Sequence, residues 1–293
     1  MSAATEFLAP VSVEEAVGAL MDDADAVAVG GSTAVSLMMK EGLLAPSRLV
    51  WLGRLPEWGS ITAGSDTLRI GGGATLAELA GSEPVRRLAP AVAAAAGVAA
   101  NPRVRAVATI GGHLAHADPR QDLPPVLLAI GASVVVAGPD GERTLPVDEL
   151  LVGFYETSLR PAEVITAVQV PLLAGSRQVY ARFNPASADD YPTVGIAVQA
   201  QVGDAGTVER IRLAAGGCSG RAVLLGRAAT AVEGRSKDTL DLAAVQAAVE
   251  EEMPVAADHR GSAFYKRRVA GVWARRAVTA ALDGRGPLLG QIA

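Results

Sequence analysis

Apolar and polar residues follow two different patterns along the chain. Up to about residue 175, short apolar runs alternate with helical periodicities, and glycine turns separate them. From about residue 176, three strand-like runs come first and helices follow. Runs of strands followed by runs of helices are typical of an α+β domain with an antiparallel sheet. The sequence therefore predicts an α+β protein with domains at 1–175 and 176–293.

The first domain divides into two lobes, at about 1–56 and 57–175. In the first lobe, a capping-box pattern predicts a helix at Val13–Leu20. Buried strands are expected at Ala26–Val29 and Arg48–Leu52, with a helix between them that Ser32 or Thr33 would cap. This order predicts a small α/β unit.

The second lobe is also expected to be a small α/β unit. Its sequence predicts a hairpin, a helix capped by Thr75 with Glu78, and an alanine-rich helix at Val85–Val98. The remaining expected elements are a helix from Asp122 to Ala129 and strands at Ser133–Ala137, Arg143–Pro146 and Glu163–Pro171.

The C-terminal domain is expected to contain a three-stranded antiparallel sheet and three helices. The strands are predicted at Gln178–Phe183, Thr193–Val202 and Val208–Ala215, and the helices at Arg221–Val232, Leu240–Glu251 and Ala263–Leu282.

Composition excludes several classes of function. Half of the 293 residues are hydrophobic but only 4% are aromatic, and the formal charge is −5. That is typical of a globular protein with small-side-chain packing, and no basic tract suggests nucleic acid. Cys218 is the only cysteine, which excludes a disulfide, a zinc cluster or an iron–sulfur site within this chain.

The sequence also shows no pattern of a signal peptide or a membrane span. The N-terminus does not have the pattern of a signal peptide, and the most apolar run, Ala91–Ala100, is too short to span a bilayer. A cytoplasmic protein is the default expectation.

Two glycine stretches organise the first 120 residues. One is Val27–Ala34 and the other is Thr109–Pro119, and each places two adjacent glycines beside an apolar run. Adjacent glycines permit positive φ and let a ligand approach the bare main chain. Successive N–H groups and a helix start can bind an anion. Two such stretches predict a phosphate-bearing cofactor held from both sides.

Other chemistry is less well supported by the sequence. His113, His116 and Asp118 have a spacing that suits metal ligands, but a third nitrogen or sulfur ligand close by is missing. We interpret the histidines as polar groups in a cofactor cleft. Cys218 is interpreted as a buried structural residue. There is no nucleophile elbow and no dinucleotide motif of the G-x-G-x-x-G type.

A polar turn at Asp189–Tyr191 has two interpretations. Its carboxylates can simply cap the turn, or Tyr191 can lie against a planar ligand at the domain junction. Arg182 likewise is either a solvated strand residue or a fixed cation that faces an electron-rich ring.

Together these stretches resemble the FAD-binding medium subunit of the molybdenum hydroxylases, the group of carbon monoxide dehydrogenase and xanthine dehydrogenase. The likeness covers nearly the whole chain in order. The matching stretches are Val29–Thr33, Gly72–Leu79, Thr109–Gly112, Ala115–Pro119, Asp122–Pro125 and Asp189–Tyr191.

The resemblance implies a two-lobed FAD-binding domain and a set of cofactor-binding residues, with no catalytic acid or base and no metal ligand. These residues are Val29, Gly30, Gly31, Ser32, Thr33, Ala34, Thr109, Ile110, Gly111, Gly112, His113, Asp122, Ile165, Arg182 and Tyr191.

The resemblance also implies individual roles. The two glycine stretches would hold the FAD diphosphate from opposite lobes. Asp122 would bond the ribityl hydroxyls, and Ile165 would pack near the flavin or the adenine. Arg182 would lie near the pyrimidine edge of the flavin and favour its reduced, anionic form. Tyr191 would shield the ring.

Three positions depart from the family pattern. The first motif is one residue longer before Lys40, His113 stands where asparagine is common, and Arg182 replaces a lysine. The last two substitutions could change the flavin potential.

The resemblance implies an electron-transfer subunit. Electrons would arrive from an iron–sulfur small subunit and leave through FAD, while a molybdopterin-binding large subunit oxidises the substrate, so a hetero-oligomer is expected. The alternatives are a stand-alone flavin oxidase that binds its own small substrate, and a non-redox nucleotide-binding or assembly protein. The substrate and the terminal acceptor are not encoded in recognisable motifs.

Overall fold

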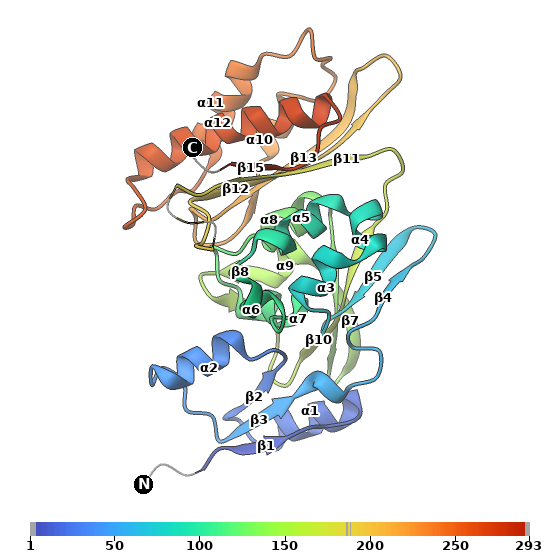
Figure 1. Ribbon diagram of the computed structural model, residues 1–293, viewed down its shortest axis with the longest axis vertical. Coiled ribbons are helices and arrows are strands. Elements are labelled where there is room, and N and C mark those ends of the chain that lie inside the picture. The colour runs from blue at the N-terminus through green and yellow to red at the C-terminus, as the bar shows by residue number, and fades with distance from the viewer. Residues whose placement is uncertain (1–3, 186, 188, 291–293) are drawn as a thin grey trace.

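The protein is built on three main sheets stacked along its long axis (Figure 1). The computed structural model describes residues 4–185, 187 and 189–290. We call the sheets the first sheet, the central sheet and the C-terminal sheet, in chain order. The mixed α+β class expected from the sequence is confirmed.

The first sheet has three parallel strands in the order β1-β3-β2. Its elements are β1 (Glu6–Leu8), α1 (Val13–Met21), β2 (Ala26–Val29), α2 (Thr33–Lys40), β3 (Arg48–Trp51) and the 3₁₀ turn Leu52–Arg54. Helix α1 begins where predicted because the Ser12 side chain accepts from the N–H of Glu15. Because the strands are parallel, β2 and β3 both run toward the same edge of the sheet, and the first glycine stretch follows β2 there.

The central sheet has five strands in the order β4-β5-β10-β6-β7, and its neighbours are all antiparallel. Its strands, and the small β8–β9 ribbon, are β4 (Ile61–Ala63), β5 (Thr67–Gly71), β6 (Ser133–Gly138), β7 (Gly141–Pro146), β8 (Leu151–Gly153), β9 (Glu156–Thr157) and β10 (Val164–Pro171). Its helices are α3 (Leu76–Gly81), α4 (Glu83–Leu88), α5 (Pro90–Val98), α6 (Pro102–Arg105), α7 (Ile110–His116), α8 (Leu123–Ala129) and α9 (Val147–Leu150).

The C-terminal sheet has five strands in the order β14-β13-β12-β11-β15. Its elements are β11 (Arg177–Phe183), β12 (Val194–Val202), β13 (Val208–Gly216), β14 (Val223–Leu224), α10 (Gly226–Thr230), α11 (Leu242–Glu252), α12 (Ala263–Leu282) and β15 (Leu288–Gly290).

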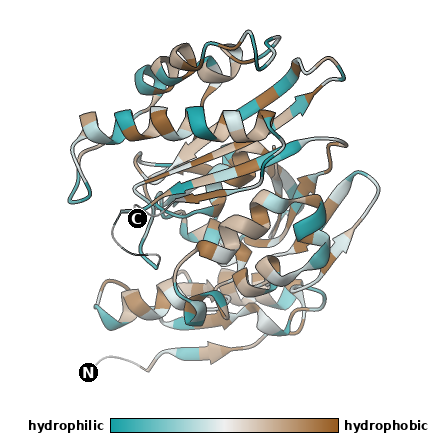
Figure 2. Ribbon diagram, turned by 45° about the horizontal axis from the view of Figure 1, so that its top comes forward, coloured by the Kyte–Doolittle hydropathy of each residue, from teal (hydrophilic) through white to brown (hydrophobic). Residues whose placement is uncertain are grey.

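Both faces of the C-terminal sheet are buried. We call the central sheet together with its helices the central unit. On strand β11, Tyr180 belongs to the core shared with this central unit, whereas Val179 and Ala181 belong to the core under α11 and α12. Helices α5 and α8 lie between the central and C-terminal sheets (Figure 1). In Figure 2 brown and tan segments dominate this middle layer, while teal segments appear at hairpin tips and on outer helices. The sheet therefore joins the two parts of the chain through one continuous apolar layer.

Three expectations about the elements were wrong in detail. The alanine-rich helix expected at Val85–Val98 is two helices, because Pro90 lacks the N–H that a continuous helix needs and instead begins α5. The helix expected at Arg221–Val232 is reduced to α10, since Val223 and Leu224 pair with β13.

The C-terminal sheet also exceeds the expected three antiparallel strands. Strand β14 adds at one edge and β15 adds parallel to β11 at the other. These two strands have only two and three residues, which is too short to produce a periodic sequence signal.

Candidate functional site

A cleft of about 610 Å³ lies between the first sheet and the central unit, and we call it the glycine cleft. Both lobes contribute lining residues. The first lobe contributes Phe7, Val29, Gly30, Gly31, Ser32, Leu49, Trp51, Gly53 and Leu55, and the second contributes Trp58, Gly59, Gly73, Thr75, Ala106, Val107 and Thr109. The two glycine stretches singled out in the sequence thus approach each other across one cavity.

The first glycine pair lies in direct backbone contact with the opposite wall. A methyl group placed on Gly31 would lie 1.6 Å from the carbonyl oxygen of Val107, and one on Gly30 would lie 2.6 Å from Thr109 Oγ1. Any side chain at these positions would push the two walls apart. Glycine is therefore required here for close approach.

The second glycine stretch is helical. Gly111 lies in α7, and a methyl group on it would lie 2.8 Å from the carbonyl oxygen of Gly72. Neither pair of glycines has a positive φ, contrary to the conformational argument made from the sequence. The left-handed residues of the two stretches are Ser32, at φ 57°, and Ala117, at φ 49°, and the Ser32 side chain makes no capping bond to α2. The following residues, Thr33 and Ala34, form the first turn of α2.

Helix α7 starts at the glycine cleft. Thr109 caps it, with Oγ1 accepting from the N–H of Gly112 at 3.2 Å. Its seven residues span about 10 Å. The helix therefore leads from the cleft, past Ile110, to His116 and the junction with the C-terminal sheet.

His113 lies within α7 and is half-buried as a residue. Its Nε2 atom is enclosed and has no hydrogen-bond partner among the described residues. Burial lowers the pKa of His113 to about 4, and the nearby Asp118 carboxylate only partly offsets this effect. The imidazole is therefore neutral near pH 7, with one ring nitrogen available to a ligand.

A buried ion pair connects the central unit to the C-terminal sheet. Arg182 on β11 donates from Nε to Asp122 Oδ1 at 2.8 Å, and Tyr180 donates to the same oxygen at 2.6 Å. Asp122 and Arg182 are 3% and 5% exposed. Burial raises the pKa of Asp122, against the opposing effects of the Arg182 guanidinium and the Tyr180 hydroxyl. The two predicted site residues thus form one hydrogen-bonded unit.

Tyr191 lies near this ion pair, in the turn before β12. Arg182 Nη2 donates to the carbonyl oxygen of Asp190, the residue before it. Tyr191 is 42% exposed, and burial of its remaining surface, followed by the Asp118 carboxylate, raises its pKa. We call the group Asp118, Asp122, Arg182 and Tyr191 the junction cluster.

Ile165 is the predicted site residue that belongs to the wall behind the glycine cleft. It lies on β10 with its side chain in the central core, and its carbonyl oxygen accepts from Trp58 Nε1 at 3.3 Å. A methyl group on Gly72 would lie 2.3 Å from the same carbonyl oxygen.

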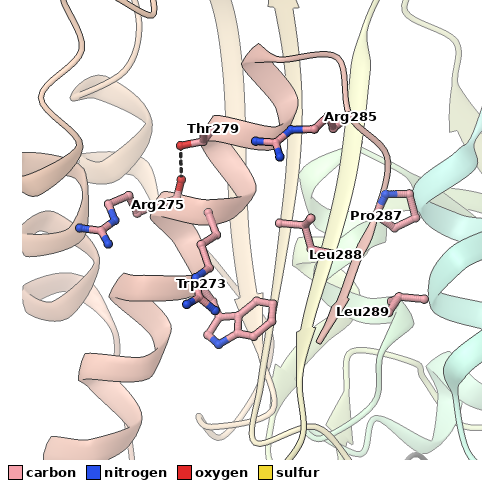
Figure 3. A pocket seen from close by; sticks show the side chains of 8 residues that line it. Trp273, Arg275, Thr279, Arg285, Pro287, Leu288 and Leu289 are labelled. Atoms are coloured by element: carbon pink, nitrogen blue, oxygen red, sulfur yellow. Dashed lines mark hydrogen bonds between the residues drawn. The ribbon is translucent and has the colours of Figure 1, made fainter. Parts of the chain in front are cut away.

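A second cavity of about 520 Å³ lies beside α12 and β15, and we call it the C-terminal groove (Figure 3). Its lining residues are Trp273, Arg275, Arg276, Thr279, Arg285, Pro287, Leu288 and Leu289. Figure 3 shows Leu288 pointing toward α12, while Arg275 extends to the opposite side of the helix. None of the predicted site residues lines this groove.

Comparison with known proteins identifies the family. The profile of the FAD-binding domain in molybdopterin dehydrogenases matches residues 3–173, and that of the carbon monoxide dehydrogenase flavoprotein C-terminal domain matches residues 179–281. The chain belongs to the FAD-binding medium subunits of the molybdenum hydroxylases.

Individual relatives of this medium subunit agree with that assignment. The carbon monoxide dehydrogenase medium chain of Hydrogenophaga pseudoflava is 35% identical over 289 residues, covering 94% of this chain and 96% of the relative. The nicotine 6-hydroxylase medium subunit of Paenarthrobacter nicotinovorans is 31% identical over 278 residues, covering 95% and 97%. In a solved structure of carbon monoxide dehydrogenase from H. pseudoflava, the matching chain superposes with a TM-score of 0.91 at 34% identity, covering 97% of this chain and 99% of that one.

The cofactor of the family is FAD, and the medium subunit described here has a site that fits it. Gly30, Gly31 and Ser32 line one wall of the glycine cleft, and Gly73 and Thr109 line the other, so a diphosphate there would meet main chain and small side chains. The enclosed, unpartnered His113 Nε2 is a polar atom that a ligand can satisfy.

Sequence reasoning missed two aromatic residues of the medium subunit. Trp58 is 8% exposed, lines the glycine cleft and packs on Gly73. Trp51 lines the same cleft and stacks on Phe7, with ring centroids 6.3 Å apart. The scarcity of aromatic residues was an available signal, but nothing in the sequence indicated which of them would face the cleft.

Two further negative findings concern the described residues. No group of three or more histidine, cysteine, aspartate or glutamate side chains there is arranged to hold a metal ion. No helix among them is both long enough and apolar enough to cross a bilayer. Cys218 is buried with a free thiol, and burial raises its pKa to about 12, as expected for a structural residue.

Proposed function

We propose that this medium subunit carries electrons from an iron–sulfur partner subunit through FAD to an acceptor, while a molybdopterin-binding large subunit oxidises the substrate. The observation that supports this most directly is the glycine cleft, where two stretches that are far apart in sequence meet with bare main chain. The chain itself has a single cysteine, so cysteine-ligated clusters must lie on another chain.

We propose that the chain is divided at the 175/176 boundary into an FAD-binding domain and a C-terminal domain. In the first domain, main-chain N–H groups of Val29–Ala34 would bind the diphosphate, and Thr109–His113 would meet it from the opposite wall. The N–H groups of residues 110–113 already donate within the protein, so this second stretch would not supply them as donors. Ile165 would support the wall behind them, through the Trp58 indole that its carbonyl oxygen holds. Bound FAD supplies two-electron redox chemistry that no side chain in this protein can provide.

The junction cluster would contact the redox-active end of the cofactor. Asp122 and Arg182 would act there as a unit, because each is the buried partner of the other. Asp122 would accept hydrogen bonds from the ribityl hydroxyls, and Arg182 would place positive charge near the flavin pyrimidine. A cation there stabilises an anionic ring. Tyr191 would cover the ring and limit the access of solvent.

A spectroscopic experiment distinguishes the proposal from a stand-alone oxidase. The chain alone, loaded with FAD, is mixed anaerobically with aldehydes, purines, heterocycles or carbon monoxide, and the flavin absorption is followed. We expect no bleaching from the chain alone, and bleaching by one of these substrates in the complex purified with its partner subunits. Direct reduction of the isolated chain by a small substrate would support the oxidase instead. A chain that retains no FAD would support the non-redox alternative.

A further inference from the structure

Arg260 contacts two consecutive residues, Asp190 and Tyr191, of the turn before β12, which we call the junction turn. It lies between α11 and α12, and its Nη2 atom is 2.5 Å from Asp190 Oδ1. Its guanidinium carbon also lies 5.9 Å from the centroid of the Tyr191 ring. One cation therefore pairs with the carboxylate of Asp190 and lies over the aromatic face of the next residue.

The segment that carries Arg260 is itself fixed to the long helix α12. The carboxylate of Asp258 accepts from the backbone N–H of Arg260 at 2.8 Å, and the same oxygen lies 2.6 Å from Lys266 Nζ. Lys266 lies on α12 and is 1% exposed. Arg260 thus reaches the turn from a rigid base, which reduces the entropy lost when it pairs.

Tyr191 follows Asp190 at the end of the junction turn, and its side chain also hydrogen-bonds to Asp118. The turn is also held on its other side, where the Asp190 carbonyl oxygen accepts from Arg182 and from Asn184. The Asp190 carboxylate accepts the Tyr191 N–H at 2.7 Å, so the ion pair with Arg260 also orients the backbone that carries the ring. A cation over an aromatic face contributes about 0.5–2 kcal/mol, depending on its exposure to solvent.

The ion pair is partly shielded from solvent. The side chains of Arg260 and Asp190 are 13% and 35% exposed, and exposed pairs contribute least. Arg260 Nη1 is enclosed and has no hydrogen-bond partner among the described residues. Such a donor is costly unless a water molecule or a ligand satisfies it. The partial burial of Arg260 is therefore offset by its ion pair with Asp190 and its contact with the Tyr191 ring.

We infer that Arg260 is a positioning residue for Tyr191, which it holds in place at the flavin side of the junction cluster. The inference rests on the proposed function, since it assigns to Tyr191 the role of covering the flavin. Arg260 acts through Tyr191 and Asp190 and is not a catalytic residue. The binding of FAD through the glycine cleft does not depend on it.

The test measures access to the bound flavin. The full chain is loaded with FAD, and quenching of the flavin fluorescence by acrylamide, a neutral quencher, is compared among variants. Arg260→Leu and Tyr191→Ala should each increase the quenching constant of the bound flavin severalfold, and the FAD content of Arg260→Leu should stay at the wild-type level. Arg267→Leu is the matched control, because it removes an exposed arginine from α12 and should leave quenching unchanged.

A double variant makes the test specific. If Arg260 acts through Tyr191, then adding Arg260→Leu to Tyr191→Ala should produce no further increase in quenching. Arg260→Lys should restore part of the protection. Asp190→Asn removes only the ionic attraction and should give an intermediate quenching constant. This variant replaces Arg260→Leu in the test if Arg260→Leu does not fold.

The inference would be overturned by wild-type quenching in Arg260→Leu or Asp190→Asn, or by additive effects in the double variant. These outcomes differ from failure of the proposed function. A wild-type chain that binds no FAD would contradict the proposed function, whereas FAD that stays protected in Arg260→Leu would contradict only the role of Arg260.

Discussion

The two cavities of this protein differ in the charge of their lining side chains. The cavity proposed for the anionic cofactor is the uncharged one. The glycine cleft has no charged side chain among its lining residues in the described part of the chain. The C-terminal groove has three arginines, of which Arg276 lies over the Trp273 ring at 5.1 Å. Counting charges would assign an anionic cofactor to the groove. The proposed function, which follows the glycine stretches and the family to which the chain belongs, places it in the cleft.

The difference shows how a protein can bind an anion without a cation. Main-chain N–H groups are fixed donors, and they can surround a phosphate wherever side chains do not keep it away. Arginines on a helix surface are mobile and hydrated, and they bind anions with less geometric selection. The proposed cofactor site is lined by main chain and small side chains, so substitutions that add a side chain should be more damaging than those that remove a charge.

The largest effect is expected from Gly31→Ala. The added methyl group would overlap the Val107 carbonyl oxygen, so the two walls of the glycine cleft must separate. We expect loss of FAD retention, measured as the ratio of flavin to protein absorbance after gel filtration. Gly18→Ala is the control, because a methyl group there meets nothing within 4 Å and replaces a glycine inside α1. Gly31→Ala with full FAD content would contradict the role of the cleft.

The next largest effect is expected from Asp122→Asn, which changes the ion pair that links the central unit to the C-terminal sheet. This substitution removes the Asp122 carboxylate from its buried ion pair with Arg182, and breaking such a pair costs about 3–5 kcal/mol in the free energy of unfolding. Chemical denaturation measures the loss. In the control Glu83→Gln, which breaks an exposed pair with Arg87, the change should be about 0.5 kcal/mol or less. Equal effects in the two variants would show that the junction pair does not join the two parts of the chain.

A smaller, pH-dependent effect is expected from His113 in helix α7. Its pKa is about 4 in the folded protein and 6.5 for the free side chain. Between these values the unfolded chain binds a proton that the folded chain excludes. The free energy of unfolding should therefore fall as the pH falls from 6.5 toward 4, by at most about 1.4 kcal/mol per unit from this residue.

The variant His113→Asn isolates this contribution. Asparagine does not titrate, so its denaturation curves should depend less on pH across this window than those of the wild type. Parallel pH dependences in the two proteins would show that His113 is not desolvated in the folded state.

The smallest effect is expected from the C-terminal groove. Arg275→Gln combined with Arg276→Gln removes two of its three arginines. FAD content and affinity should remain at wild-type values, as measured by equilibrium dialysis. A clear loss of affinity would assign part of the cofactor to the groove and would reverse the comparison between the two cavities.

Local signals in the sequence predicted the elements that frame the site. The capping box formed by Thr75 and Glu78 is present with both of its hydrogen bonds, and the last helix runs from Ala263 to Leu282 as expected. These predictions succeed because caps and helical periodicity act within a few residues. The meeting of the two glycine stretches was also anticipated, since both were interpreted as contacts to one ligand.

Contacts between distant segments could not be predicted in the same way. Trp58 packs on Gly73, and Arg260 reaches Asp190 across 70 positions in the chain. Neither has a spacing that a single sequence reveals. Short edge strands such as β15 likewise form only because β11 offers an unpaired edge. Tertiary structure decides these features.

The most direct test of the account is a crystal structure of the full chain with bound FAD. We predict that the diphosphate lies in the glycine cleft, with its oxygens accepting hydrogen bonds from main-chain N–H groups of Gly30–Ser32, and that the flavin faces Tyr191. A diphosphate bound instead by Arg275, Arg276 or Arg285 in the C-terminal groove would contradict the account.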